Sequence, residues 1–135
     1  MPHVHIGSQA EYVNIRLPES FSSEGWGQAQ VEVATEGFRG SIKPWLERDE
    51  LVRFLHALEA LYEQLHGRAE LTPVEKQFFL SLAGDGKGHM AVSGEAASST
   101  YQNKLQFSFH IDQTFLPQVV AQLKALLGQT HAPGA

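Results

Sequence analysis

Apolar residues recur every three or four positions in two segments of the chain, and this spacing predicts two amphipathic helices. Asp49 is the expected N-cap of the first helix and Gly67 its expected stop, and Thr114 and Gly128 take these roles in the second. The apolar stripe of the first helix comprises Leu51, Phe54, Leu55, Leu58, Leu61, Tyr62 and Leu65. The stripe of the second comprises Leu116, Val119, Val120, Leu123, Leu126 and Leu127.

Alternation of apolar and polar residues predicts strands in most of the remaining chain. The cleanest alternation covers residues 105–111, where four apolar residues are separated by three polar ones. Further strands are expected at residues 13–17, 28–33, 38–45, 77–83 and 89–94. Three strands then precede each helix. The pattern therefore predicts an α+β fold, a mainly antiparallel sheet of about six strands with two amphipathic helices on one face, in the order βββα-βββα.

The two predicted helices resemble each other in their apolar positions. When the first is shifted by 65 positions, Leu51 falls on Leu116 and Phe54 on Val119. An internal duplication would explain the match, and so would two amphipathic helices packing independently on the same sheet. In either case, we expect a single domain over residues 1–128 and a frayed C-terminal tail over residues 129–135.

The composition is that of a globular protein without cysteine chemistry. Of 135 residues, 42% are hydrophobic and 19% charged, as in domains that bury their own core. The absence of cysteine excludes disulfides, a thiol nucleophile and a cysteine zinc site, and it fits a reducing compartment, so a cytoplasmic location is expected. No apolar run approaches the roughly 20 residues of a membrane-spanning helix. Residues 1–12 lack the basic and apolar regions of a secretory signal.

The negative charge of the chain lies in its first half. Residues 1–66 contain ten acidic and five basic side chains, whereas residues 67–135 contain five of each. A one-sided acidic field repels nucleic acid and attracts a basic protein, which is therefore the expected kind of partner. The alternative interpretation is that the acidic surface only keeps the protein soluble.

Motifs that would indicate catalysis or cofactor binding are missing. The Gly-Asp-Gly-Lys-Gly-His segment at residues 84–89 lacks the Ser or Thr and the following helix of a phosphate-binding loop, so it is interpreted as a hairpin turn. His3 and His5 form a feasible metal pair without a third ligand nearby. We therefore predict no catalytic residues, no metal site and no cofactor, and a protein that is not an enzyme.

Two tryptophans and three glutamates are the candidate partner-binding residues. Trp26 lies in a polar loop, where a large apolar ring either folds back onto the core or anchors a partner. Trp45 is the second candidate anchor. The contact surface is predicted on the first helix and its start, around Glu47, Glu59 and Glu63.

Two other classes of function stay open. A small-ligand domain or an enzyme of unrecognised type would need a deep pocket gathering His89, Asn103, His110 and Asp112. Asp112 has a structural interpretation as well, because it precedes the second helix and can cap it. A homodimeric structural protein, joined through sheet edges or faces, is the third possibility.

Several turns, caps and core positions together resemble the WapI family of bacterial immunity proteins. The resemblance covers about residues 25–127, and its segments are Trp26-Gly27, Gly37-Phe38-Arg39-Gly40, Asp49-Glu50-Leu51, Leu61-Tyr62, residues 84–89, Asn103, Leu105-Gln106-Phe107 and Asp112-Gln113-Thr114-Phe115-Leu116. It implies a cytoplasmic protein of a toxin–immunity pair, which binds and neutralises a contact-delivered toxin domain, often a nuclease. It supplies no catalytic residues.

Overall fold

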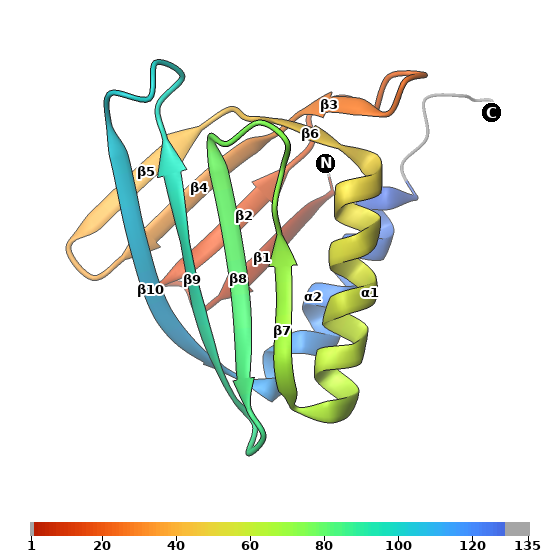
Figure 1. The fold of residues 1–135 in the computed structure, drawn as a ribbon, viewed down its shortest axis with the longest axis vertical. Coiled ribbons are helices and arrows are strands. Elements are labelled where there is room, and N and C mark those ends of the chain that lie inside the picture. Colours follow the sequence, from red (N-terminus) through yellow and green to blue (C-terminus); the bar gives the residue numbers. More distant parts are fainter. Residues whose placement is uncertain (1, 129–135) are drawn as a thin grey trace.

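A computed structural model describes residues 2–128, which form ten strands, one 3-10 turn and two α-helices (Figure 1). The strands are β1 (His3–Gly7), β2 (Tyr12–Arg16), β3 (Trp26–Gln28), β4 (Gln30–Thr35), β5 (Phe38–Ile42), β6 (Trp45–Glu47), β7 (His66–Leu71), β8 (Phe78–Asp85), β9 (His89–Ala97) and β10 (Lys104–Asp112). The helices are α1 (Arg48–Gln64) and α2 (Leu116–Leu127), the second preceded by the 3-10 turn η1 (Gln113–Phe115).

The strands form three antiparallel sheets. The N-terminal sheet has the order β1-β2-β4-β5, the C-terminal sheet has the order β10-β9-β8-β7, and β3 pairs with β6 in a short ribbon. The α+β class and the antiparallel pairing are confirmed. The single sheet of about six strands is wrong, and the βββα-βββα order is not what the chain adopts, because six strands precede α1 and four precede α2.

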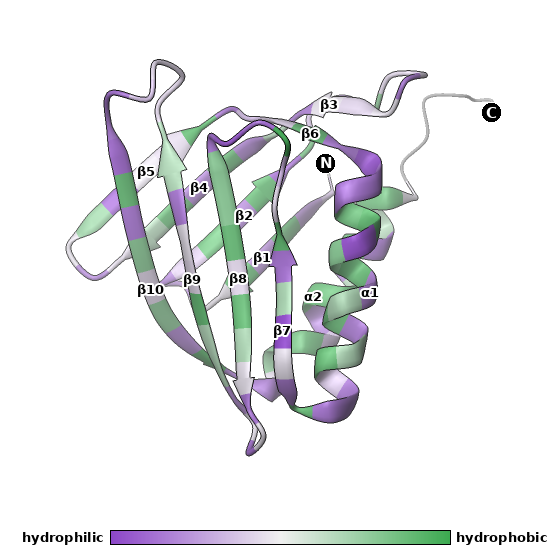
Figure 2. Cartoon of the chain, in the orientation of Figure 1, coloured by the Kyte–Doolittle hydropathy of each residue, from purple (hydrophilic) through white to green (hydrophobic). Residues whose placement is uncertain are grey.

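The missed strands have physical reasons. β1 and β7 are short, five and six residues, and each has only two buried side chains, which is too brief a pattern to predict a strand. Residues 38–45 do not form one strand. The chain leaves the N-terminal sheet after Ile42 and enters the ribbon at Trp45. Where alternation is regular it is followed, as in β10, where Phe107, Phe109 and Ile111 are buried between exposed polar residues (Figure 2).

The two large sheets pack on each other and the helices close one side of the molecule (Figure 1). The sheets meet where β5 contacts β9 and β4 contacts β10, and α1 lies along β7 while α2 lies on β1. One continuous core fills the space between them, with its largest fully buried side chains including Phe54, Phe78, Ile6, Ile15 and Leu46. The prediction that both helices cover one face of a single sheet is therefore wrong.

The helix boundaries differ from the predicted ones at three points. Glu47, not Asp49, is the N-cap of α1, and the helix ends at Gln64, where Leu65 adopts a left-handed conformation with φ 64°. Tyr62 is 45% exposed and so does not belong to the apolar stripe. Thr114 does not cap α2, because it lies inside η1 and its backbone N–H donates to Asp112 Oδ1 at 3.1 Å.

The alignment of the two helices extends to their burial. At the shift of 65 positions, Leu51, Phe54, Leu58 and Leu61 of α1 and their counterparts in α2 are all buried. Each helix also follows a four-stranded antiparallel sheet, and a duplication stays a prediction. No helix within residues 2–128 is long and apolar enough to cross a bilayer. The predicted tail, residues 129–135, lies outside the described residues.

Candidate functional site

The β3–β6 ribbon carries both tryptophans of the chain on one face. Trp26 lies opposite Glu47, and Gln28 lies opposite Trp45. Because side chains alternate along each strand, these four residues share one face of the ribbon and the residues between them share the other. Trp45 is 47% exposed and Trp26 is half-buried. The outer face of the ribbon is therefore a diagonal pair of indoles flanked by a carboxylate and an amide.

The inner face of the ribbon is fixed to the core. Leu46 is fully buried, and a Cβ added to Gly27 would lie 2.9 Å from Leu17 Cδ1 and 3.0 Å from Phe21 Cδ1. Glycine is thus what allows β3 to lie flat on Leu17 and Phe21. Backbone hydrogen bonds fasten both ends of the ribbon, from Arg48 N to Gly25 O at 2.8 Å and from Ala29 N to Pro44 O at 2.9 Å. The tryptophan face is therefore preformed.

A groove of about 490 Å³ runs along this face. It is lined by Pro18, Glu19, Ser20, Ser22, Trp26, Gly27, Gln28, Ala29, Gln30, Lys43 and Trp45. Within residues 2–128, the ring contacts join His5 with Tyr12 and Phe107 with Phe109, so the two indoles do not stack on each other. Both indoles therefore line the groove without stacking on each other.

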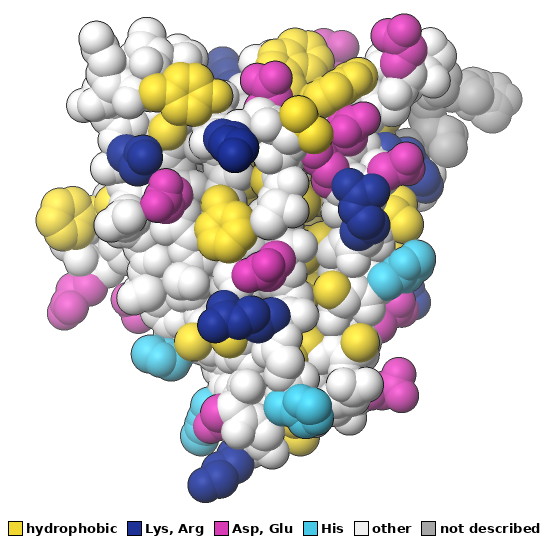
Figure 3. Space-filling view, viewed as in Figure 1, with side chains coloured by type: hydrophobic (Ala, Val, Ile, Leu, Met, Phe, Trp, Pro, Cys, Tyr) yellow, Lys and Arg dark blue, Asp and Glu magenta, His cyan; other side chains and the backbone are white. Residues whose placement is uncertain are grey.

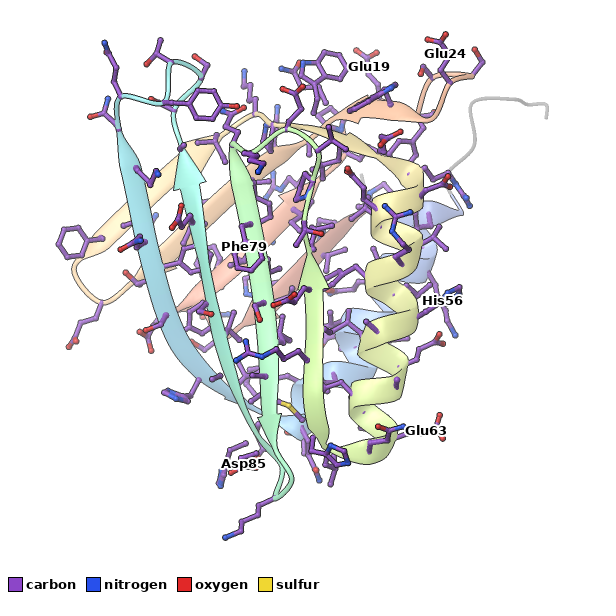
Figure 4. All side chains as sticks on the ribbon, viewed as in Figure 1. Glu19, Glu24, His56, Glu63, Phe79 and Asp85 are labelled. Atoms are coloured by element: carbon purple, nitrogen blue, oxygen red, sulfur yellow. The ribbon has the colours of Figure 1, made fainter. Side chains whose placement is uncertain are left out.

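The surroundings of the groove are acidic. In Figure 4, Glu19 and Glu24 lie at the ribbon end of the molecule, whereas Glu63 and Asp85 lie at the opposite end. Figure 3 shows hydrophobic side chains at the ribbon end among several acidic ones. In residues 18–30 and 43–49, the acidic side chains are Glu19, Glu24, Glu47 and Asp49 and the basic ones are Lys43 and Arg48, a balance of −2. We call residues 18–30 and 43–49 the ribbon surface.

Glu59 and Glu63 lie in a second groove, between α1 and α2. This groove has a volume of about 430 Å³ and is lined by Glu59, Tyr62, Glu63, Pro117, Val120, Ala121 and Lys124. Lys124 Nζ lies 3.2 Å from Glu59 Oε2, so the charge of Glu59 is partly compensated within the chain. At 1.5 Å per helical residue, Glu63 lies about 24 Å from Glu47. The five predicted contact residues thus form two separate groups.

The alternative pocket residues are not gathered around one point. His89 pairs with Asp112 at one end of the β9–β10 pair, and His110 lies two residues before Asp112 on the same face. Asn103 precedes β10 at its other end, about 30 Å away at roughly 3.3 Å per residue. All four side chains are exposed. Asp112 has the structural role that its position suggests, since it accepts a hydrogen bond from Thr114 N at 3.1 Å.

His5, one of the two N-terminal histidines, is held by contacts within the chain. His5 Nε2 donates to Ser8 O at 2.9 Å, and Asn14 Nδ2 donates to His5 Nδ1 at 2.9 Å. Arg16 Nε in turn donates to Asn14 Oδ1 at 3.3 Å, so a polar network covers this part of the N-terminal sheet. In residues 2–128 no three His, Cys, Asp or Glu side chains are grouped so that they could hold a metal ion.

Glu19 and Glu24 are site residues that the sequence did not indicate. They precede β3 in an irregular segment, and nothing in their spacing relates them to Trp45. Only the pairing of β3 with β6, across 16 intervening residues (29–44 between Gln28 and Trp45), brings the two parts of the groove together. The excess of acidic residues in the first half of the chain was the available signal. The composition does not show where on the surface these residues lie.

A family model described as "Immunity protein WapI-like family" matches residues 4–130 of the chain. No curated protein sequence matches the chain. Among solved structures, that of the plant transcriptional regulator PBF-2 is similar with a TM-score of 0.49 and 11% identity, covering 93% of this chain and 79% of that one. WHY3 from Arabidopsis thaliana is similar with a TM-score of 0.49 and 14% identity, covering 94% and 86%.

Proposed function

The chain belongs to the WapI-like immunity protein family, and we propose that it is a bacterial cytoplasmic immunity protein that binds and neutralises one toxin domain. Neutralisation is by association, without a catalytic step in this chain. The partner is a protein with a basic surface.

The observation that carries this proposal is the ribbon surface. Partly exposed tryptophans are the side chains that most often dominate the binding energy of protein interfaces. Here both tryptophans of the chain line one groove, and the ribbon surface that contains it has a charge balance of −2. Acidic side chains around an apolar centre accelerate encounter with a basic protein and exclude acidic ones. The arrangement therefore supports a protein partner with a basic contact surface.

Glu59 and Glu63 extend the proposed contact surface along α1. A standard interface covers about 800 Å² on each partner, which is roughly 30 Å across. That span exceeds the distance of about 24 Å along the helix from Glu47 to Glu63. One partner can therefore contact the ribbon surface with Trp26 and Trp45 and reach the groove between α1 and α2.

Affinity capture from the native cell extract, at low and at moderate salt, tests the proposal. We expect one basic protein to be recovered, less of it at moderate salt, and we expect that protein to be toxic when expressed alone and harmless with this chain. Recovering no protein, or one whose expression is harmless, would contradict the immunity function.

The same capture tests the contact surface. Changing Glu47, Glu59 and Glu63 together to Gln should reduce recovery of the partner, since three charges of the proposed interface are lost. A matched control changes Glu11, Glu36 and Glu70 to Gln, which alters the net charge equally at other places. Equal recovery with both triple variants would exclude the proposed surface while leaving the immunity function intact.

A further inference from the structure

The positions of the two tryptophans on the ribbon leave room for a planar group between their side chains. Trp26 and Trp45 are diagonal neighbours on one face of an antiparallel pair, because each lies opposite the residue two positions from the other. Such side chains start about 7 Å apart. A flat group stacked between two rings needs about 3.5 Å on each side, so side chains that start about 7 Å apart leave room for one. Both indoles line the groove and are not in ring contact with each other.

The charges around this space favour a cation. Glu19 lines the groove, and Glu47 lies beside Trp26 on the same face of the ribbon. Lys43 also lines the groove and offsets one of these carboxylates. Glu24, in the turn before Trp26, adds a further negative charge at this end (Figure 4). The net field at the indoles is therefore negative.

Arginine matches the room for a planar group and the negative charge around the groove better than lysine does. Its guanidinium is planar and stacks on aromatic faces, and it is less strongly hydrated than an ammonium group. Its N–H groups form a fork that pairs with carboxylates. Lysine offers a compact, strongly hydrated charge that cannot stack on two rings at once.

We infer that the groove between Trp26 and Trp45 is a binding site for a guanidinium group, and that it receives an arginine side chain of the partner protein. The identity of the partner as a protein rests on the proposed function, whereas the chemistry of the groove does not. Glu19 is the carboxylate placed to pair with the guanidinium, and the two indoles hold it from both sides.

The two tryptophans make the site directly observable by NMR. Since the chain contains two Trp residues, both indole N–H signals of the ¹⁵N-labelled protein report on the groove. The probe is N-acetyl-arginine amide, titrated at constant ionic strength. N-acetyl-citrulline amide serves as the uncharged control of the same shape, and N-acetyl-lysine amide as the cation that is not planar. We expect saturable shifts of both indole signals with the arginine probe, weaker ones with lysine and none with citrulline.

Single substitutions identify the residues that bind the arginine probe. Glu19→Gln should weaken binding of the arginine probe about two- to fivefold, as expected for one exposed ion pair. Trp45→Ala should weaken it about two- to fivefold through loss of one ring face. Glu36→Gln, which changes the net charge equally in the β4–β5 turn, should leave binding unchanged. Because Glu19 is exposed, its variant is not expected to perturb the fold.

The outcomes separate the site from the function. Equal shifts with arginine and citrulline, or no saturable shift with arginine, would overturn the guanidinium site. So would binding that Glu19→Gln and Trp45→Ala leave unchanged. None of these results would affect recovery of a toxic basic partner, which tests the proposed function. Conversely, a guanidinium site found in a protein that captures no partner would uphold the site and contradict the immunity function.

Discussion

Glu50 joins the start of α1 to the loop between β7 and β8. Its side chain is 3% exposed, and its two carboxylate oxygens accept hydrogen bonds from Glu47 N and Val74 N, both at 2.8 Å. A buried carboxylate is costly unless its oxygens are hydrogen-bonded. Its position in the first turn is favoured further by the helix dipole. This side chain therefore fixes the start of α1 relative to the loop between β7 and β8.

Replacing Glu50 with Gln should lower the free energy of unfolding by about 1–3 kcal/mol. The amide retains one acceptor oxygen, so one of the two backbone N–H groups faces an NH₂ group and loses its partner. Urea denaturation measures the change. Asp49→Asn, in the same turn but exposed, should stay within about 0.5 kcal/mol. Equal effects of the two variants would show that Glu50 does not join the elements.

The side chain of Asp85 fastens the β8–β9 turn. Its Oδ1 accepts hydrogen bonds from the backbone N–H groups of Lys87 at 2.6 Å and His89 at 3.2 Å. Chiefly the Lys87 bond, and then the His89 bond, hold the pKa of Asp85 below its ordinary value of 3.8. A lowered pKa means that this stabilisation is complete above the unfolded value and is lost as pH falls through the folded value.

We expect the Lys87 and His89 amides to exchange faster relative to the rest of the hairpin as the pH falls below about 4, the range of an unperturbed Asp carboxyl. NMR titration of the Asp85 carboxyl, with hydrogen exchange of the two amides, checks this. Asp85→Asn, which does not titrate, should remove the pH dependence. A pH dependence that persists in the variant would assign it to another group.

Close packing in the C-terminal sheet depends on a glycine in the middle of β9. Gly94 lies between Leu80 of β8 and Phe107 of β10 in the register of the sheet. A Cβ added there would overlap the carbonyl oxygen of Phe79 and lie 2.7 Å from Phe107 Cζ. The ring of Phe107 therefore occupies the space that a side chain at residue 94 would need.

Gly94→Ala should destabilise the protein by about 3 kcal/mol, the upper end of the cost of overpacking, because backbone as well as a ring must move. Thermal and urea unfolding measure this cost. Ser93→Ala, at the next position but on the other face, should change stability by no more than about 0.5 kcal/mol. An effect of Gly94→Ala as small as that of Ser93→Ala would show that β9 shifts without strain.

In the whole molecule, each half of the chain completes the other. α1 ends the first half but lies along β7, the first strand of the second half. α2 ends the second half but lies on β1, the first strand of the first half, where Gln122 Oε1 accepts a hydrogen bond from His5 N at 2.8 Å. The core is continuous across both halves. Each half therefore lacks the helix that covers its first strand.

We expect residues 1–65 and 66–135 not to fold when expressed separately and to regain structure when they are co-expressed. The intact chain should unfold in one transition, because the shared core couples the halves. Circular dichroism of the fragments, and unfolding followed by two probes, check this. A fragment that unfolds cooperatively by itself would contradict the prediction of a single domain over residues 1–128.

The sequence by itself determined the features that depend on neighbouring residues. Helical spacing located α1 and α2, strict alternation located β10, and the glycine-rich turn at residues 84–88 was identified from its composition. Trp26 was singled out because a large apolar ring in a polar loop is unusual, and the binding role of Trp26 and Trp45 stays a prediction. The family was also identified at this level, since its turns and core positions are local segments.

Only the tertiary structure decided how distant segments meet. The pairing of β3 with β6 placed Trp45 beside Trp26 and Glu19, and the length of α1 separated Glu63 from them. The split of the strands into two packed sheets, with each helix on a strand of the other half, was likewise invisible in the periodicity. Periodicity records which face of an element is buried but not what buries it, because that choice depends on contacts far apart along the chain.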